Sequence, residues 1–346
     1  MKILVTGGCG FIGSNFIRHK INNDSECRIF NIDKLTYAGN LRNMDDVRDN
    51  PRYKFVRGDI CNSDLINKLF SEEKFDAVIN FAAESHVDRS ILDSFPFIET
   101  NVKGVQVLLE ATRRYPIWKF IQISTDEVYG SADGDIKFKE DSRLLPNSPY
   151  AASKAAADLL CRSYYKAYGI PIIITRSSNN YGPYQFPEKL IPLMIRNALL
   201  GKELPVYGKG KQVRDWLYVE DNCRAIDIVL QRGSIGEVYN IGGNQEKRNI
   251  EVVRLICQLL AQELQKPQED FEKLITYISD PRGAAHDYRY ALDYRKIKEG
   301  LGWSPIVGFE EGLRLTSRWY LAHQELVESV ITGEYLEYYD RVYGGK

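Results

Sequence analysis

Short apolar runs alternate with longer amphipathic stretches along the first half of the chain. The runs are rich in β-branched and aromatic residues, and most are apolar on consecutive positions, a pattern typical of strands covered on both faces of a parallel sheet. They lie at residues 2–6, 28–33, 53–56, 76–81, 120–124 and 172–175. Helices are predicted near residues 12–20, 96–115 and 149–168. This order predicts an α/β fold with a doubly wound, Rossmann-type parallel sheet.

The predicted helix at 149–168 has clear ends, because Ser148 can cap it, Pro149 suits its first position and Gly169 can end it in a left-handed conformation. After about residue 178 the alternation loosens, although a strand at 238–241 and helices at 250–263 and 310–323 are still indicated. We therefore predict a Rossmann domain over residues 1–178. A smaller α/β lobe over residues 179–346 is intermingled with it, the strand at 238–241 returns to the first sheet, and a ligand cleft lies between the lobes.

Composition narrows the class of protein. The 346 residues are 44% hydrophobic and 27% charged, as in globular enzymes, and the formal net charge of −1 gives no overall attraction to nucleic acid or an anionic membrane. The first residues, MKILVTGG, lack the charged start and long apolar core of a signal peptide, and no run of about 18 apolar residues occurs, so neither a signal peptide nor a membrane span is expected. The six cysteines are far apart, without metal-ligand spacing. We interpret them as buried thiols of a cytoplasmic protein without a structural metal.

A glycine-rich turn follows the first predicted strand and opens the first helix. Gly7, Gly10 and Gly13 would let the backbone approach a pyrophosphate, and the free N–H groups and the helix dipole favour the anion. Asp33 ends the second predicted strand, where a carboxylate can accept hydrogen bonds from a ribose and repel a 2′-phosphate. These features predict NAD as the cofactor. The alternative for Asp33 is that it only caps a loop.

Tyr150 and Lys154 form a Tyr-x-x-x-Lys pattern, so both side chains face one side of the predicted helix. An ammonium near a phenol stabilises the phenolate, and we expect Lys154 to lower the pKa of Tyr150. A phenolate can then take a hydroxyl proton while hydride leaves the same carbon for nicotinamide. Alone, the pattern also describes an ordinary surface pair.

Two adjacent carboxyl groups and a hydroxyl follow the fifth predicted strand, at Thr125, Asp126 and Glu127. Strand ends in such sheets border the ligand crevice, where these groups could supply both an acid and a base. We expect crowding and partial burial to raise the pKa of at least one carboxyl group. Neighbours on a regular strand point in opposite directions, so joint action requires an irregular backbone. The alternative is a solvated acidic turn.

Over essentially its whole length the sequence resembles the dTDP-glucose 4,6-dehydratases of the extended short-chain dehydrogenase/reductase superfamily. The resemblance rests on TGGCGFIGSNF, NFAAESHVDRSI, STDEVYG, SPYAASKAAAD, RSSNNYGPYQFPEKLIP, VRDWLYVED, YNIGGNQEKRN and LGWSP. The acidic pair is the specific part, since related epimerases and decarboxylases share the other motifs. The resemblance to this family implies that Tyr150 takes the C4 hydroxyl proton with help from Thr125. It further implies that Glu127 removes the C5 proton and that Asp126 protonates the departing C6 hydroxyl.

The predicted site residues follow from these motifs. Predicted cofactor contacts are Gly7, Gly10, Phe11, Ile12, Gly13, Asp33, Lys34, Leu35, Thr36, Asp59, Ile60, Phe81, Ala82, Ala83, Thr100, Tyr150, Lys154 and Asn180. Predicted contacts of the dTDP-glucose substrate are Ser85, Thr125, Asn179, Lys189, Leu190, Pro205, Val206, Tyr207, Arg214, Asn249, Arg282 and His286. The resemblance also implies a homodimer formed by the helices at 96–115 and 149–168.

One loop departs from the family pattern D-R-P-G-H-D. Residues 280–287 read DPRGAAHD, so that Pro281 and Arg282 are exchanged and two residues are added. Arg282 is expected to reach the diphosphate from a new direction, and the preference between thymidine and uridine stays open. Arg214 could instead pair with Asp215 or Asp221, and His286 could be a surface residue. The alternatives to a dehydratase are a UDP-sugar 4-epimerase or decarboxylase, and a nucleotide-binding protein without turnover.

Overall fold

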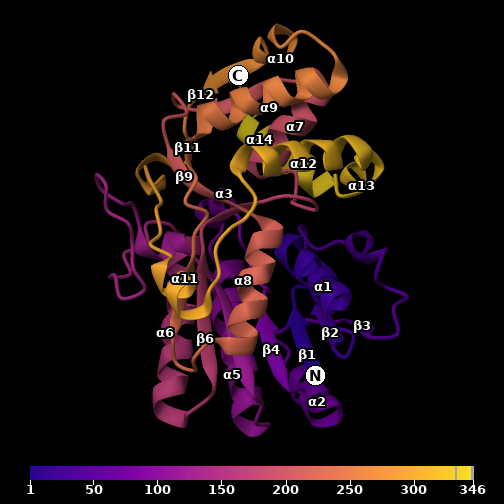
Figure 1. The fold of residues 1–346 in the computed structure, drawn as a ribbon, viewed down its shortest axis with the longest axis vertical. Coiled ribbons are helices and arrows are strands. Elements are labelled where there is room, and N and C mark those ends of the chain that lie inside the picture. The colour runs from indigo at the N-terminus through magenta and orange to yellow at the C-terminus, as the bar shows by residue number, and fades with distance from the viewer. Residues whose placement is uncertain (332, 344–346) are drawn as a thin grey trace.

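A computed structural model describes residues 1–331 and 333–343 of the chain. Its largest sheet has seven parallel strands (Figure 1). The strands run in the order β10-β6-β5-β4-β1-β2-β3, so the strand order reverses between β1 and β4. Such a reversal opens a crevice at the carboxyl ends of the strands. The strands are β1 (Lys2–Thr6), β2 (Arg28–Asp33), β3 (Tyr53–Arg57), β4 (Ala77–Asn80), β5 (Lys119–Thr125), β6 (Ile172–Ser177) and β10 (Val238–Ile241). The predicted fold class is confirmed, and the ends of β3, β4, β5 and β6 differ from the predicted ones by one or two residues.

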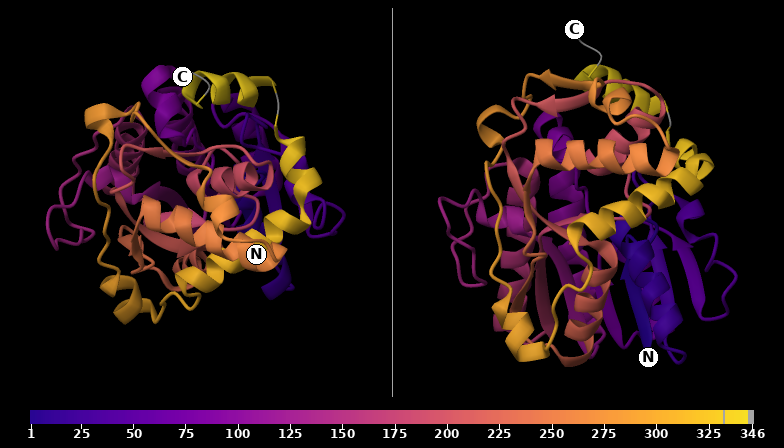
Figure 2. Two further views of the ribbon diagram at one scale, coloured as in Figure 1. Left: turned by 90° about the horizontal axis from the view of Figure 1, so that it is seen from above. Right: turned by 45° about the horizontal axis from the view of Figure 1, so that its top comes forward.

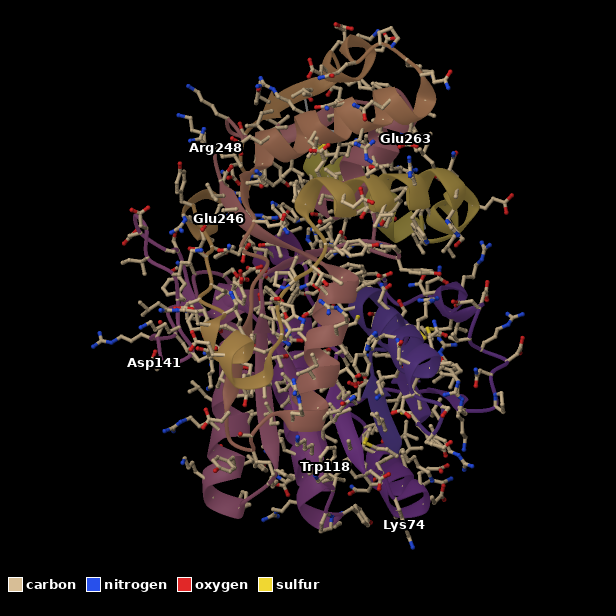
Figure 3. The ribbon with its side chains drawn as sticks, viewed as in Figure 1. Lys74, Trp118, Asp141, Glu246, Arg248 and Glu263 are labelled. Atoms are coloured by element: carbon tan, nitrogen blue, oxygen red, sulfur yellow. The ribbon has the colours of Figure 1, made fainter. Side chains whose placement is uncertain are left out.

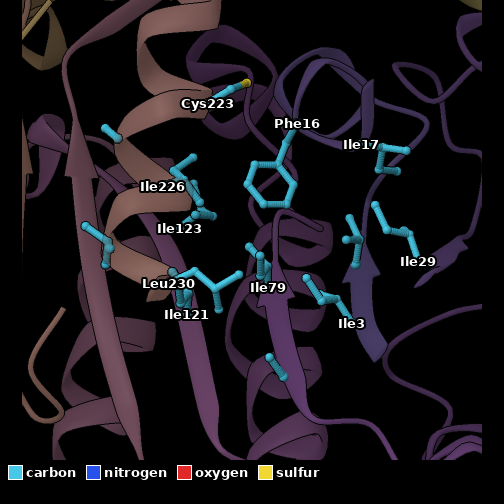
Figure 4. Close-up of a cluster of buried hydrophobic side chains, with 14 of the residues drawn as sticks. Ile3, Phe16, Ile17, Ile29, Ile79, Ile121, Ile123, Cys223, Ile226 and Leu230 are labelled. Carbon is cyan, nitrogen blue, oxygen red and sulfur yellow. The ribbon is translucent and has the colours of Figure 1, made fainter. Parts of the chain in front are cut away.

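Helices cover both faces of this sheet. One face packs against α1 (Phe11–Asn23), α8 (Val219–Arg232) and α11 (Arg295–Leu301). The other packs against α2 (Ser63–Glu73), α5 (Val105–Arg114) and α6 (Pro149–Tyr168). Figure 4 shows Phe16 of α1 and Ile226 of α8 over the isoleucines of neighbouring strands. Because alternate strand residues enter the two cores, consecutive positions must be apolar, which is the pattern of the sequence. Helix α6 has the predicted ends, with Ser148 as N-cap and Gly169 as left-handed C-cap.

The segment predicted as one helix over 96–115 is helical but irregular. After α3 (Val87–Leu92), it consists of α4 (Phe95–Ile98), a π-helix η2 (Glu99–Gly104) and α5. The wide turn turns Asn101 inward, where Oδ1 accepts a hydrogen bond from the Glu84 N–H (2.9 Å) and Nδ2 donates to Ser153 Oγ (2.8 Å). Hydrophobic periodicity does not reveal such a turn, which commonly marks a functional site.

A second lobe lies beyond the carboxyl ends of the sheet, at the opposite end of the molecule from the N-terminus (Figures 1 and 2). It holds a three-stranded sheet, β11 (Glu246–Arg248), β9 (Val213–Tyr218) and β7 (Asn179–Tyr181), and a two-stranded sheet, β12 (Ile275–Ile278) and β8 (Leu204–Tyr207). Its helices are α7 (Leu190–Leu199), α9 (Asn249–Leu264), α10 (Glu269–Glu272), α12 (Phe309–Ala322), α13 (Gln324–Ser329) and α14 (Gly333–Tyr343). Short 3-10 turns are η1 (Leu41–Met44), η3 (Asp126–Tyr129) and η4 (Gly283–Ala285). The strand predicted at 238–241 does pair with β6.

Charged side chains cover the outside of both lobes, among them Lys74 below the sheet and Arg248 on the second lobe (Figure 3). Within the described residues, no helix is both long and apolar enough to cross a membrane, and no three histidine, cysteine or acidic side chains are grouped to hold a metal ion. All six cysteines are free. Five are buried as predicted, whereas Cys61 is only half-buried, because it sits in the loop after β3 at the molecular surface.

Candidate active site

Two adjoining cavities lie at the carboxyl ends of the sheet strands. The first is bordered by the glycine turn after β1, the ends of β2, β4 and β5, and α6. The second lies between η3 and the second lobe, against α7, β8, β9 and the loop that contains η4. Gln185, Glu188 and Lys189 line both, so the two cavities form one continuous site.

The glycine turn brings backbone against backbone in the first cavity. A Cβ on Gly7, whose φ is +68°, would lie 2.6 Å from the Ala82 nitrogen, and a Cβ on Gly13 would lie 2.5 Å from the Gly7 oxygen. Gly10 is the N-cap of α1 and supplies no side-chain cap. An anion can therefore reach the N–H groups of the helix end, and the cavity fits a dinucleotide pyrophosphate.

Most of the predicted cofactor residues line this first cavity. They are Gly7, Gly10, Phe11, Ile12, Gly13, Asp33, Lys34, Thr36, Asp59, Ile60, Phe81, Ala82, Ala83, Thr100, Tyr150 and Lys154. Leu35 does not line it, and Asn180 lines the second cavity instead. Ser85, predicted to contact the substrate, also borders the first cavity.

Asp33 caps the loop after β2 and also lines the first cavity. Its Oδ1 accepts a hydrogen bond from the Leu35 N–H (2.8 Å), which caps the loop, and its Oδ2 accepts one from the Cys9 N–H (2.9 Å). Burial raises its pKa, and the two N–H donors oppose that rise. A carboxylate has about four acceptor positions, so the oxygens that border the cavity can still accept from a ribose.

The acidic pair lies on the irregular backbone that its joint action requires. Strand β5 ends at Thr125, whose hydroxyl oxygen accepts a hydrogen bond from the Glu127 N–H (3.3 Å) and so caps the turn η3. The Thr125 hydroxyl also donates to Asp126 Oδ1 (3.2 Å). Asp126 is only 2% exposed and Glu127 faces the second cavity, so the alternative of a solvated acidic turn is wrong.

Burial controls the protonation of both carboxyl groups. It is the largest cause that raises the pKa of Asp126, followed by the negative charges of Glu127 and Asp215. Burial likewise raises the pKa of Glu127, although Arg282 and Arg214 act in the opposite direction. The expected rise is therefore confirmed for both groups. Asp126 is the more strongly affected, and it suits the part of a proton donor.

Tyr150 and Lys154 both border the first cavity from α6. The predicted effect of the lysine on the phenol is wrong for the protein alone. Burial, and after it the charge of Glu127, raise the pKa of Tyr150, and a hydrogen bond with Thr125 lowers it only in part. The Lys154 ammonium instead donates to the Ile123 carbonyl (2.6 Å), and burial lowers its own pKa to about 8.

The second cavity gathers most residues predicted to bind the nucleotide sugar. These are Asn179, Lys189, Leu190, Pro205, Val206, Tyr207, Arg214, Asn249, Arg282 and His286. Thr125 and Asp126 line neither cavity, but the Thr125 hydroxyl contacts both the Glu127 N–H and the Tyr150 side chain. The Lys189 ammonium donates to the Ser85 carbonyl (2.9 Å). This contact joins the two cavities.

The alternatives weighed for Arg214 and His286 are both wrong. The Arg214 guanidinium donates to the Asp287 carbonyl (2.9 Å), not to Asp215 or Asp221, and it stays at the cavity wall. His286 also lines the cavity and contacts the Asp280 carboxylate. Burial, with Arg282 and Arg214 nearby, lowers the pKa of His286 to about 4. A neutral imidazole therefore faces this site at pH 7.

Several cavity residues were not found from the sequence. Gln185, Glu188, His86, Asp88 and Tyr290 all contribute to the second cavity. All of them except Tyr290 lie inside quoted motifs, yet an acidic residue in the first turn of a helix, such as Asp88, is typical of ordinary helix starts. These residues are recognised as members of one site only in the folded protein, where α3, the 185–189 segment and the second lobe line the same cavity.

Comparison with known proteins settles the family. The family model for GDP-mannose 4,6 dehydratase matches residues 4–316. The dTDP-glucose 4,6-dehydratase of Shigella flexneri is 50% identical over 364 residues, with 100% of both chains covered. The chain belongs to the dTDP-glucose 4,6-dehydratase family. The structure of a dTDP-glucose 4,6-dehydratase from Bacillus anthracis, in complex with NAD, is similar with a TM-score of 0.87 and 49% identity, over 95% of this chain and 99% of that one.

The same architecture also serves other reactions. UDP-glucose 4-epimerase of Thermotoga maritima, solved with UDP-glucose, has a TM-score of 0.84 to this chain at 30% identity, and covers 94% of this chain and 100% of its own. Dehydratases and an epimerase therefore share this fold, and the fold alone does not distinguish the reactions. The side chains of the site must distinguish the reactions.

Proposed function

We propose that this chain is an NAD-dependent nucleoside-diphosphate-glucose 4,6-dehydratase, which converts dTDP-glucose to dTDP-4-keto-6-deoxyglucose for deoxysugar synthesis. One observation carries the proposal. Two carboxyl groups of raised pKa, on Asp126 and Glu127, are close enough to Tyr150 for their charges to act on its phenol. Glu127 lines the second cavity and Tyr150 the first, and Asp126 is buried directly behind them without lining either. Epimerisation at C4 requires no acid beside C6, whereas loss of water requires both an acid and a base there.

The residues of the chain divide the proton transfers among them. Tyr150 takes the C4 hydroxyl proton in its phenolate form, with Thr125 hydrogen-bonded beside it. Burial raises the pKa of this phenol, and the positive charge of a bound nicotinamide would lower it again. NAD, held by the glycine turn, Asp33 and Lys154, would supply the acceptor for the C4 hydride and the donor of the hydride to C6. Glu127 removes the C5 proton, which the 4-ketone acidifies, and later returns it to C5. Asp126 protonates the departing C6 hydroxyl, which leaves as water. The proton gained by Tyr150 balances the one lost by Asp126, so the overall reaction loses only water.

Binding of the two ligands is assigned to the two cavities. The glycine turn, Asp33 and Lys154 would hold NAD in the first. Arg214, Arg282 and the neutral His286 would hold the diphosphate in the second, where guanidinium groups suit bidentate contacts with phosphate oxygens. The apolar wall formed by Leu190, Pro205 and Val206 suits a nucleoside base.

Product analysis tests the proposal. The purified protein is incubated separately with dTDP-glucose and UDP-glucose, and the products are identified by NMR and mass spectrometry. We expect a 4-keto-6-deoxy sugar, formed faster from dTDP-glucose. Equal or faster conversion of UDP-glucose would revise the base preference. A galactose epimer, or binding of NAD without any product, would overturn the dehydratase assignment.

We further propose a homodimer in the cytoplasm. Leu92 on α3, Phe95 and Ile98 on α4, and Leu159 on α6 have exposed apolar side chains, and Phe95 is 85% exposed. Helices α3 and α4 both contact α6. Packing of this face against a second copy would bury them, because contiguous exposed apolar patches commonly mark interfaces. The six free cysteines suit a reducing compartment. Sedimentation of the purified protein, compared with a Phe95→Glu variant, tests the dimer.

A further inference from the structure

Asp88 is a buried acidic residue in the wall of the second cavity that the proposed reaction does not use. It lies in the first turn of α3 and is only 5% exposed. Its presence is unexpected on simple charge grounds, because this cavity gathers Arg214, Arg282 and Lys189 for an anionic ligand. A carboxylate in the wall, like Glu127 and Glu188, competes with a diphosphate for these cations. We therefore looked for a contribution of Asp88 to ligand binding that outweighs this competition.

The two oxygens of Asp88 have separate partners. Oδ1 accepts from Nε of Arg282, and the two side chains form an ion pair. Oδ2 accepts from the hydroxyl of Tyr207 (3.1 Å) and from that of Tyr338 (3.2 Å). Arg282 and Tyr207 line the cavity, whereas Tyr338 is a buried residue of the C-terminal helix α14. One carboxylate thus connects α3, β8, the loop containing η4 and α14.

Asp88 is charged at neutral pH. Burial acts to raise its pKa, but the positive charge of Arg282 and the donated hydrogen bonds outweigh burial and bring the pKa to about 2. The Arg282 guanidinium also lies over the Tyr207 ring, 5.6 Å from its centroid. Arginine and tyrosine are thus fixed to each other as well as to the carboxylate.

Anchoring through Nε has a geometric consequence for Arg282. A guanidinium carries one N–H on Nε and four on the two Nη atoms, in a rigid plane. Holding Nε fixes the plane and leaves the Nη edge for a bidentate contact with phosphate oxygens. The anchor is most needed here, because Arg282 sits in an irregular loop next to η4 and not on a strand or a long helix.

We infer that Asp88 is a positioning residue of the nucleotide-sugar site, which orients Arg282 and Tyr207 toward the ligand and is itself held by Tyr338 of the C-terminal helix. The inference rests on the proposed function, since it takes the second cavity as the binding site for a nucleoside diphosphate. If Asp88 affected the ligand only through its negative charge, the opposite result would be expected for Asp88→Asn. Removal of its negative charge would then tighten the binding of the anion.

The test compares Asp88→Asn with the unmodified enzyme. Calorimetry measures the dissociation constant of dTDP, and kinetics with dTDP-glucose separate KM from kcat. We expect the dissociation constant and KM to rise roughly tenfold or more, with kcat within about threefold and the NAD content unchanged. Unchanged or tighter dTDP binding overturns the inference. Asp64→Asn is the matched control, because Asp64 is an exposed acidic residue in the first turn of α2.

Two further variants keep the test decisive. Tyr338→Phe removes one hydroxyl and leaves the ion pair, and we expect dTDP binding to weaken about threefold. If Asp88→Asn does not fold, this variant decides, and unaltered binding would overturn the inference. In an Arg282→Gln background, Asp88→Asn should have less effect than alone, because the two residues act together. A wild-type protein that binds dTDP but forms no product from dTDP-glucose would refute the proposed reaction and not the role of Asp88.

Discussion

The buried Lys154 ammonium makes a testable contribution to stability. The side chain is 5% exposed within α6, and its ammonium donates to the Ile123 carbonyl at 2.6 Å. Burial lowers its pKa from an ordinary 10.5 to about 8, despite the opposing negative charge of Asp158. The folded protein therefore binds this proton more weakly than the unfolded chain does.

The sign of the effect follows from that difference. Between pH 8 and 10.5 the unfolded chain holds the proton and the folded protein has lost it, so the free energy of unfolding increases with pH in this window. The fall in pKa corresponds to a penalty of roughly 3 kcal/mol at pH 7. About 2.5 kcal/mol of this penalty should disappear between pH 7 and pH 10.

Lys154→Met isolates the contribution of Lys154 together with its effect on its neighbours Asp158 and Cys161, because groups farther away titrate equally in both proteins. We would measure urea unfolding of wild type and variant at several pH values from 7 to 10. The stability of the wild type relative to Lys154→Met should increase by roughly 2–3 kcal/mol over this range. Lys166→Met, at an exposed position of the same helix, is the control and should shift by less than about 0.5 kcal/mol. A relative stability that does not change with pH would refute the reasoning.

Two other substitutions test the packing around the site. The buried Tyr129 hydroxyl accepts a hydrogen bond from Arg176 (2.7 Å) and donates one to Asn240 (2.8 Å). Tyr129→Phe should therefore lower the free energy of unfolding by roughly 2–4 kcal/mol. A loss below about 1 kcal/mol in urea unfolding would contradict this. In Gly13→Ala the new Cβ would lie 2.5 Å from the Gly7 oxygen, so NAD binding measured by calorimetry should weaken at least about tenfold, and an unaltered affinity would argue against the close packing of the turn.

Local chemistry explains why much of the first half could be predicted from the sequence. Strands of a parallel sheet are apolar on both faces, so β1 and β2 are visible as continuous runs with the predicted ends. Helix α6 carries its own start and stop signals in Ser148, Pro149 and Gly169. The glycine turn and Asp33 border one cavity because strand ends in such a fold meet at one edge.

The remaining features depend on contacts between distant segments. The π-turn η2 exists because Asn101 must turn inward toward Glu84 and Ser153, which no periodicity reveals. Strands β7, β8, β9, β11 and β12 were not predicted, since they are short and their pairing partners are far away in the chain. The pKa of Tyr150 was predicted with the wrong sign, because spacing places Lys154 on the same face but does not report that both side chains are buried.

The central claim is that Tyr150 serves the oxidation at C4, whereas Asp126 and Glu127 serve the loss of water. A double variant tests it most directly. Asp126→Asn combined with Glu127→Gln keeps Tyr150 and Lys154 but removes the acid and the base for elimination. After rapid mixing with dTDP-glucose, we expect the absorbance of reduced nicotinamide to rise and persist, with no 4-keto-6-deoxy product. Release of that product at the wild-type rate would contradict the account.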